Sequence, residues 1–198
     1  FLYGNLWEFI MSIVIINNFG QYNHRISRTL TYLGIENKLI SNTTSIDEIK
    51  DLNPEGIILG GGPSIENIGN CKEIIQQMDV PILGICLGHQ IIAEVFNGET
   101  KSAEIESYAQ IEINIIEESE LFKDMGDSVK VWASHKDEVA KLPENFKILA
   151  NSDKCSIEAM KHNEKPIYGI QFHPEVQHTP RGGEIFENFY RICKEYKN

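Results

Sequence analysis

The sequence predicts an α/β fold: an open, mostly parallel central sheet with helices on both faces and an antiparallel, strand-rich extension. Three observations predict it. Short apolar runs alternate with helical patterns as far as residue 96, as they do in parallel sheets. Glycine-containing turns directly follow two of those runs, at the place where open sheets hold their sites. Beyond residue 96, strand patterns follow one another without long helices.

Short apolar runs bounded by polar residues predict the strands of the first half. These strands are expected at residues 12–17, 37–40, 56–59 and 82–85. Apolar residues at helical spacing predict a first helix between Tyr22 and Leu33, and Gly34 is well placed to end it. Ser45 or Thr44 can cap a brief helix over residues 45–50, because acidic residues occupy its first turn.

One further helix is expected before the last of these strands, since apolar residues recur there on a single stripe. The stripe consists of Ile65, Ile68, Cys71, Ile74, Ile75 and Met78. The second half predicts strands at residues 108–115, 129–132, 146–151, 156–161 and 166–171. A closing helix over residues 183–195 has an apolar face, on which Cys193 is a packing residue.

Length and charge narrow the class of protein. We expect a single domain over residues 11–198, preceded by a non-native or upstream extension over residues 1–10. That decapeptide is apolar but too short to span a bilayer, so no membrane is expected as a partner. Eighteen basic against 29 acidic residues give a net charge of −11, which repels a phosphate backbone and argues against nucleic-acid binding.

The four cysteines are widely spaced and form no Cys-x-x-Cys pair. They are Cys71, Cys86, Cys155 and Cys193. This spacing argues against a zinc site and against a small disulfide scaffold. Without a secretory signal, a reducing cytoplasm is the expected compartment.

The stretch from Ile82 to Gln90 has the pattern of a nucleophile elbow, with cysteine in place of serine. An apolar strand is cut off by Gly84-x-Cys86-x-Gly88 before a segment that can turn helical. Such a turn lifts its central side chain above the sheet, at the amino end of the helix, where the thiolate is favoured. The alternative is a small buried cysteine in an ordinary strand-helix turn, so a base must be found elsewhere.

A second turn, Gly60-Gly61-Gly62-Pro63-Ser64, ends the strand over residues 56–59. Its backbone N–H groups are open to a ligand because no Cβ atom obstructs them. A phosphate-binding loop is the rival interpretation, but the Walker Gly-Lys-Ser/Thr is missing and the spacing does not match a dinucleotide fingerprint. We therefore expect an oxyanion-binding loop beside the nucleophile.

His173 is the histidine that a predicted strand delivers to the same sheet edge as Cys86. Glu175 follows after the turn made by Pro174 and can reach the second ring nitrogen. Nucleophile, base and orienter then stand in the chain order of an elbow hydrolase. A metal site made of His173, Glu175 and His178 lacks a further ligand at a recognised spacing and leaves Cys86 without a role, so no metal is expected. His24, His89 and His162 are given surface or structural roles.

These motifs resemble those of the class I glutamine amidotransferases. The resemblance spans residues 11–198 and depends on Leu59 to Pro63, Gly84 to Gln90 and Gln171 to Glu175. It implies a flavodoxin-like sheet and an enzyme that hydrolyses L-glutamine to glutamate and ammonia through Cys86, His173 and Glu175. Gly60 departs from the serine usual in the family, but the backbone donors of the loop survive that change.

The resemblance also implies roles around the triad. The backbone N–H groups of Leu87 and Gly61 would stabilise the oxyanion, and Gly61, Gly62 and Gln90 would contact the glutamine. The segment Ser134-His135 would hold the amino-acid end of the substrate. A loop residue that contacts only a partner subunit is an equally open interpretation of His135.

Three further stretches resemble the glutaminase part of GMP synthetases. They are residues 18–22, residues 132–137, and residues 176–179 leading to Gly182. The chain has no ATP pyrophosphatase loop and stops where a fused enzyme would continue, so the resemblance implies the separate glutaminase subunit of a heterodimer. ATP and magnesium would then act in the partner, which aminates xanthosine monophosphate. Lys136, Asp137 and His178 are the residues expected to dock that partner.

Other interpretations remain open. The glutaminase subunit of anthranilate or aminodeoxychorismate synthase shares the elbow and the His-Pro-Glu turn, but residues 132–137 and 178–179 disfavour it. A γ-glutamyl cysteine hydrolase on the same fold is a rival from another enzyme class. A regulatory module without chemistry is the non-enzyme alternative, against which the intact triad argues.

Overall fold

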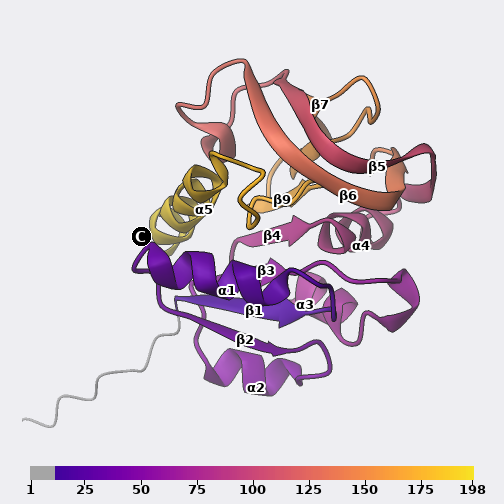
Figure 1. Cartoon of the computed structure of the whole chain (residues 1–198). Helices are drawn as coiled ribbons and strands as arrows, with labels where there is room; N and C mark the ends of the chain where they lie inside the picture. The colour runs from indigo at the N-terminus through magenta and orange to yellow at the C-terminus, as the bar shows by residue number, and fades with distance from the viewer. Residues whose placement is uncertain (1–11) are drawn as a thin grey trace, which may run out of the picture.

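One nine-stranded sheet organises the structure, a computed structural model that describes residues 12–198 (Figure 1). The strands are β1 (Ile13–Asn17), β2 (Asn37–Ser41), β3 (Gly56–Leu59), β4 (Ile82–Ile85), β5 (Glu99–Ile115), β6 (Ser128–Lys141), β7 (Phe146–Asn151), β8 (Ala159–His162) and β9 (Ile167–Ile170). Their order across the sheet is β2-β1-β3-β4-β9-β8-β7-β5-β6. The predicted extension over residues 1–10 lies outside the described residues and stays a prediction.

The sheet has a parallel half and an antiparallel half. Strands β2, β1, β3, β4 and β9 run parallel to their neighbours. From β9 onward, β8, β7, β5 and β6 pair antiparallel. The sheet therefore confirms the predicted class: a parallel α/β core with an antiparallel extension. The carboxyl ends of β3, β4 and β9 meet at one edge, which is where an open sheet holds its site.

Helices cover both faces of the parallel half (Figure 1). They are α1 (Asn23–Tyr32), α2 (Ile46–Asp51), α3 (Cys71–Gln77), α4 (Leu87–Val95) and α5 (Gly182–Lys197), with the short 3₁₀ helices η1 (Ile65–Asn67) and η2 (Glu120–Phe122). Helices α1 and α5 pack with one set of strand residues, and α2, α3 and α4 pack with the other. Successive residues of β1 point to opposite faces: Ile13 and Ile15 lie in one core, and Val14 and Ile16 lie in the other. The continuous apolar strand is therefore buried on both faces.

Local sequence signals explain several element ends. Gly34 follows α1 with a φ of +75°, the left-handed conformation that ends a helix. Ser45 caps α2 through a reciprocal pair of hydrogen bonds with Glu48, so the predicted cap is confirmed. Cys71 and Cys193 are fully buried in the two cores, as expected for packing residues.

The single helix expected over residues 65–78 is wrong. The chain forms η1, breaks, and resumes as α3. Gly69 has a φ of +52°, and the Asn70 N–H donates to the backbone oxygen of Asn42 at 2.7 Å. The break is therefore held by a contact with the loop after β2, which helical spacing alone does not reveal.

Strands β5 and β6 extend well beyond the predicted residues 108–115 and 129–132. They pair along most of their lengths, with a register shift between Ser102 and Ser107. The added part of β5 is rich in exposed polar residues, so it lacks the apolar alternation from which a strand is predicted. The longer β6 brings residues 134–137 into the sheet instead of into a loop.

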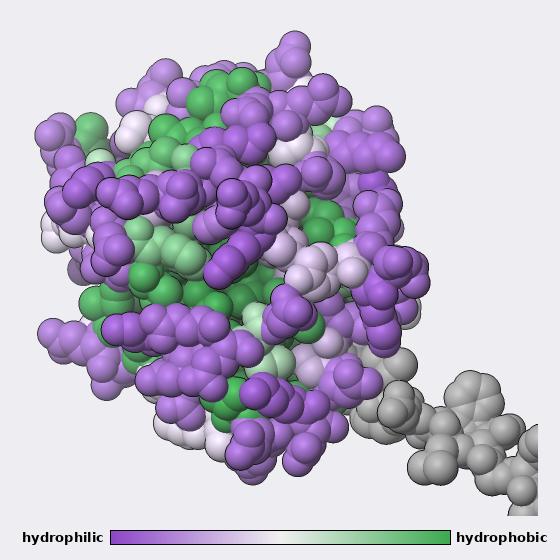
Figure 2. All heavy atoms as spheres, turned by 180° about the vertical axis from the view of Figure 1, so that it is seen from behind, coloured by the Kyte–Doolittle hydropathy of each residue, from purple (hydrophilic) through white to green (hydrophobic). Residues whose placement is uncertain are grey.

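Figure 2 shows the face opposite to that of Figure 1, where hydrophilic residues surround patches of apolar residues. One shallow apolar depression lies between η1, α3 and α4 and is lined in part by Ile68, Ile91 and Val95. None of the helices within residues 12–198 is both long enough and apolar enough to span a membrane.

Candidate active site

Cys86 occupies a sharp turn between β4 and α4. Its φ of +55° and ψ of −104° are unusual for a residue with a side chain, and such strain is typical of functional turns. The turn is held by the Cys86 N–H, which donates to the Ile170 oxygen of β9 at 2.9 Å. A Cβ atom on Gly88 would lie 2.2 Å from the oxygen of Leu59, so only glycine lets α4 approach β3. The chain thus forms the strand-turn-helix geometry of an elbow.

His173 and Glu175 form a buried pair beside the elbow. The Nδ1 atom of His173 lies 2.6 Å from Oε1 of Glu175, and the carboxylate side chain has no exposed surface. Burial alone lowers the pKa of His173, but the negative charges of Glu175 and of the Cys86 sulfur outweigh it and raise that pKa well above the usual value. This direction favours the imidazolium form of His173 beside the Cys86 sulfur.

Hydrogen bonds to β6 fix the backbone of His173. Its N–H donates to the Trp132 oxygen at 2.9 Å, an isolated bridge between the turn and the strand. The hydroxyl of Thr179 donates to the His173 oxygen at 2.6 Å and accepts from the Trp132 N–H at 2.9 Å. The ring of Tyr22 packs edge-on against the imidazole, with 5.0 Å between ring centroids. The imidazole is thus held in place from two sides.

Asparagines orient the glycine loop after β3. Asn18 Nδ2 donates to the Gly60 oxygen at 3.0 Å, while Asn23 Nδ2 and the Gly20 N–H donate to the Gly61 oxygen at 2.9 and 3.0 Å. In a trans peptide the N–H points away from the C=O. The N–H groups of Gly61 and Gly62 are therefore aimed to the side opposite the asparagines.

The glycine loop lies directly against the triad. A Cβ atom added to Gly61 would stand 3.5 Å from Cε1 of His173 and 3.8 Å from Cβ of Cys86. The predicted oxyanion donors, Gly61 and Leu87, thus flank the sulfur from the loop and from the first residue of α4. Their role in catalysis stays a prediction.

Ser134 and His135 approach the elbow from β6. The Ser134 oxygen lies 3.9 Å from the Cys86 sulfur. His135 Nδ1 donates to the Asp137 oxygen at 3.1 Å, because a carbonyl can only accept. Burial is the main reason that the pKa of His135 is lowered, so the ring is neutral and its Nε2 is an acceptor.

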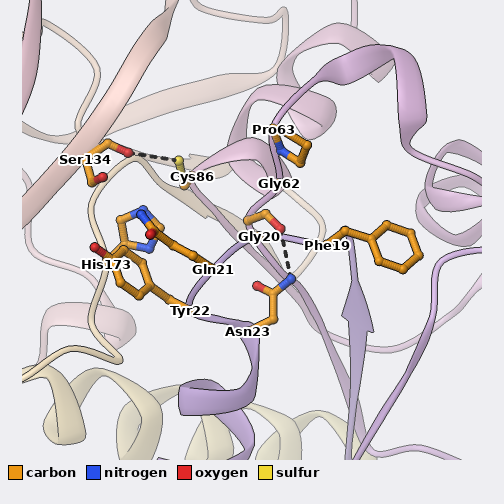
Figure 3. Close-up of a pocket in the computed structure, with 11 residues that line it drawn as sticks. Phe19, Gly20, Gln21, Tyr22, Asn23, Gly62, Pro63, Cys86, Ser134 and His173 are labelled. Atoms are coloured by element: carbon orange, nitrogen blue, oxygen red, sulfur yellow. Dashed lines mark hydrogen bonds between the residues drawn. The ribbon is translucent and has the colours of Figure 1, made fainter.

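Two cavities open onto Cys86. The first, of about 330 Å³, lies between the glycine loop, the start of α1 and His173 (Figure 3). The second, of about 390 Å³, is lined by Gln90 and by residues 134–137 of β6. Figure 3 shows the Cys86 sulfur facing the Ser134 carbonyl, while the Phe19 ring points away from the cavity. A small molecule in either cavity reaches the thiol.

The predicted glutamine-binding and docking residues surround these cavities. Gln90 is almost fully buried, and its amide nitrogen donates to the Asp137 oxygen at 2.9 Å, so its amide hydrogens are directed at protein atoms. Lys136 and Asp137 are exposed and line the second cavity. His178 is exposed and packs on Trp132 with ring centroids 4.9 Å apart. Whether Lys136, Asp137 and His178 bind a partner stays a prediction.

Residues 12–198 contain no group of three or more His, Cys, Asp or Glu side chains arranged to hold a metal ion. The interpretation of Cys86, His173 and Glu175 as a triad has its geometric support in the 2.6 Å contact between His173 and Glu175 and in the cavity that His173 shares with Cys86.

Sequence reasoning missed four polar side chains that hold the site: Asn18, Asn23, Gln171 and Thr179. All four are almost fully buried. Three of them lie inside stretches that carried the family resemblance, but a polar residue in a motif does not reveal its partner. Each has at least one hydrogen-bond partner that is 38 or more residues away in the sequence, so only the folded chain shows what it does.

The chain is similar to known proteins over nearly its whole length. The profile of the family described as glutamine amidotransferase class-I matches residues 14–193. The A subunit of a glutamine-hydrolyzing GMP synthase from Methanosphaera stadtmanae is 81% identical over 186 residues, which are 94% of this chain and 100% of that protein. The protein of the same name from Methanothermobacter thermautotrophicus is 61% identical over 182 residues, covering 92% of this chain and 98% of that one.

Solved structures agree with these relatives. The candidate A subunit of a GMP synthase from Thermoplasma acidophilum superimposes with a TM-score of 0.88 at 33% identity, covering 95% of this chain and 96% of that chain. A glutamine amidotransferase from Thermotoga maritima, at 16% identity and a TM-score of 0.70, shares the fold over 94% of this chain and 90% of its own.

Proposed function

Because this chain belongs to the class I glutamine amidotransferases, we propose that it is the glutaminase subunit of a two-subunit GMP synthase. It hydrolyses L-glutamine and supplies ammonia to a partner that aminates xanthosine monophosphate. Relatives of the same length support the subunit role. The observation that carries the chemistry is the geometry of the site: Nδ1 of His173 lies 2.6 Å from Oε1 of Glu175, and His173 lines the same cavity as Cys86.

In the first half-reaction, the Cys86 thiolate attacks the side-chain amide carbon of glutamine and forms a C–S bond. The amide C–O π electrons move to oxygen and give a tetrahedral oxyanion. His173 then donates its proton to the amide nitrogen, the C–N bond breaks, and ammonia leaves. Glu175 keeps the ring oriented and stabilises its charge before that transfer. A glutamyl thioester remains on Cys86.

In the second half-reaction, the now neutral His173 takes a proton from water, and the resulting hydroxide attacks the thioester carbon. The resulting tetrahedral oxyanion collapses, the C–S bond breaks, and its electron pair returns to sulfur. The γ-carboxylic acid so formed loses its proton to solvent water, glutamate leaves, and the Cys86 thiolate again faces an imidazolium. The site thus returns to its starting protonation state. The same imidazole therefore donates a proton in the first half-reaction and accepts one in the second.

The oxyanion of both steps would be stabilised by backbone N–H groups. Leu87 begins α4, where N–H groups have no intrahelical acceptor and the helix dipole favours negative charge. Gly61 supplies the second donor from the loop that Asn18 and Asn23 orient. Each such donor is typically worth about 3 kcal/mol in kcat.

Glutamine would lie in the cavities on either side of Cys86, against Gly61, Gly62, Ser134, His135 and Gln90. Neutral His135 can accept a hydrogen bond from the α-ammonium group of the substrate through Nε2. Since both amide hydrogens of Gln90 face protein acceptors, this residue would contact the substrate through its carbonyl oxygen.

The partner would supply the ATP-dependent chemistry, with ATP and Mg²⁺ bound there and not in this chain. Ammonia released into water is diluted and protonated, so the two active sites should be coupled by docking. Lys136, Asp137 and His178 are suited to this role because they are exposed around the site. A heterodimer in a reducing cytoplasm, which keeps the Cys86 thiol free, is the assembly that fits this chemistry.

The test compares two nitrogen sources. GMP formation is measured in the presence of the synthetase partner, using either glutamine or ammonium, for the wild-type chain and Cys86→Ala. We expect Cys86→Ala to abolish the glutamine-dependent route and leave the ammonium-dependent route intact, since only the former needs the thiol. Equal glutamine-dependent rates for the two proteins would overturn the proposal.

A further inference from the structure

Gln171 is a buried polar side chain in contact with the nucleophile. It follows directly on β9, has no exposed surface, and places its Nε2 atom 3.7 Å from the Cys86 sulfur. Its own N–H donates to the Glu158 oxygen at 2.8 Å, which fixes the backbone at this point. The residue before it, Ile170, accepts the N–H of Cys86. The end of β9 and the elbow are thus joined at both the backbone and the side chain.

A chain of hydrogen bonds settles which end of the Gln171 amide faces the sulfur. The backbone oxygen of Asp137 can only accept, so the group of Gln90 that lies 2.9 Å from it is the NH₂. The other hydrogen of that NH₂ is directed at Oε1 of Gln171, at 3.3 Å. Because Oε1 is taken by Gln90, the NH₂ of Gln171 is left to face Cys86.

We propose that Gln171 is a catalytic residue whose amide N–H donates a hydrogen bond to the Cys86 sulfur and stabilises its thiolate form, and that Gln90 is the positioning residue that orients this amide. The inference rests on the proposed role of Cys86 as the nucleophile. A hydrogen bond from a neutral N–H to a thiolate stabilises the thiolate relative to the neutral thiol. Burial strengthens this effect because water does not compete for the sulfur.

Gln171 can donate a hydrogen bond to the Cys86 sulfur at every step of the reaction, whereas His173 cannot. The imidazole gives its proton to the leaving ammonia and regains one from water, whereas an amide stays neutral and remains a donor at every step. When the thioester breaks, the electron pair of the C–S bond returns to sulfur. The Gln171 N–H is already in place to stabilise that charge, so no rearrangement is needed.

The test measures thiolate reactivity directly, without glutamine and without the partner. The rate of Cys86 alkylation by iodoacetamide is followed from pH 5 to pH 9 on the whole chain. Cys86→Ala serves as the blank for the other cysteines. We expect Gln171→Met, which keeps the length of the side chain but lacks the donor, to alkylate about tenfold more slowly on the acidic side of the profile. Its half-maximal rate should shift upward by about one pH unit.

Gln90→Met should shift the profile in the same direction by a smaller amount, because the amide of Gln171 is then free to turn. The matched control is Gln77→Met, at an exposed position on α3, which should leave the profile unchanged. Urea unfolding of each variant shows whether it is folded. If Gln171→Met does not fold, the Gln90→Met profile decides.

The inference would be overturned if the alkylation profiles of folded Gln171→Met and Gln90→Met superimposed on the wild-type profile. Both residues would then have only a packing role. Failure of the proposed function has a different signature. In that case Cys86→Ala keeps its glutamine-dependent GMP formation, while the alkylation shift of Gln171→Met persists.

Discussion

Glu175 combines complete burial of its side chain with one short hydrogen bond to His173. We expect Glu175→Gln to lower kcat of glutamine hydrolysis by about 10³–10⁴-fold, because the neutral amide no longer stabilises the imidazolium or fixes its tautomer. Burial then dominates, and the pKa of His173 falls. Steady-state kinetics measure the loss. A loss of less than about tenfold would show that the carboxylate only packs.

Glu158 is a buried carboxyl outside the triad. Burial raises its pKa to about 7, a hydrogen bond from Ser152 opposes the shift, and the charge of Glu138 adds to it. Since the folded-state pKa lies above the ordinary value of 4.5, Glu158 favours the folded state fully below pH 4.5, and this contribution is lost as the pH rises through 7.

We therefore expect Glu158→Gln to remove most of this pH dependence. From pH 4.5 to pH 7 and above, the wild type should lose up to about 3 kcal/mol of unfolding free energy through Glu158 alone. Urea unfolding at several pH values measures the difference. The exposed substitution Glu144→Gln is the control. A Glu158→Gln curve parallel to that of the wild type would contradict the expectation.

At the scale of elements, Thr179 joins β6 to the turn that carries His173. Thr179→Val keeps the shape but leaves the Trp132 N–H and the His173 oxygen each without this partner. We expect a loss of about 2 kcal/mol in unfolding free energy and a lower kcat, because the imidazole is then held less firmly. Thr179→Ser should restore both. Equal kcat values for the valine and serine variants would refute the positioning role.

The elements that hold the triad were predictable because their signals are local. An apolar run followed by glycine, cysteine and glycine indicates an elbow, and a strand ending in His-Pro-Glu places a base at the same edge. The break at Gly69 and the length of β5 were not predictable, since one depends on Asn42 and the other on pairing between exposed polar residues.

The supporting side chains were beyond sequence reasoning for a related reason. Gln171 contacts Cys86 across 85 residues of chain, and Asn18 reaches Gly60 across 42. Neither hydrophobic periodicity nor the spacing of motifs in the sequence reveals such a contact. The proposed triad of Cys86, His173 and Glu175 could be named from the sequence, whereas the contacts of Gln171 and Asn18 with the site required the fold.

At the scale of the whole molecule, β6 links the site to the proposed docking surface. Ser134 and His135 face the cavities around Cys86, and the next two residues, Lys136 and Asp137, are exposed. The same strand binds the backbone of His173 through Trp132. A partner that contacts β6 therefore contacts the strand that positions His173, the proposed base.

We expect the synthetase partner to raise the glutaminase rate of this chain. Lys136→Glu should increase several-fold the partner concentration that gives half of that effect, because the substitution reverses a charge on the docking surface. Titration of glutaminase activity with the partner measures it. The matched control is Lys38→Glu, on the opposite edge strand β2. Identical titrations for the two variants would exclude Lys136 from the interface.

The backbone of Cys86 has an evolutionary consequence. A φ of +55° costs a residue with a side chain about 1–3 kcal/mol, whereas glycine adopts such angles freely. The proposed catalytic role of Cys86 would therefore be maintained at a cost to the stability of the fold. A duplicated copy released from that selection gains stability by exchanging Cys86 for glycine. Loss of the thiol with the fold intact is thus the expected first sign of a lineage that has turned this domain to another use.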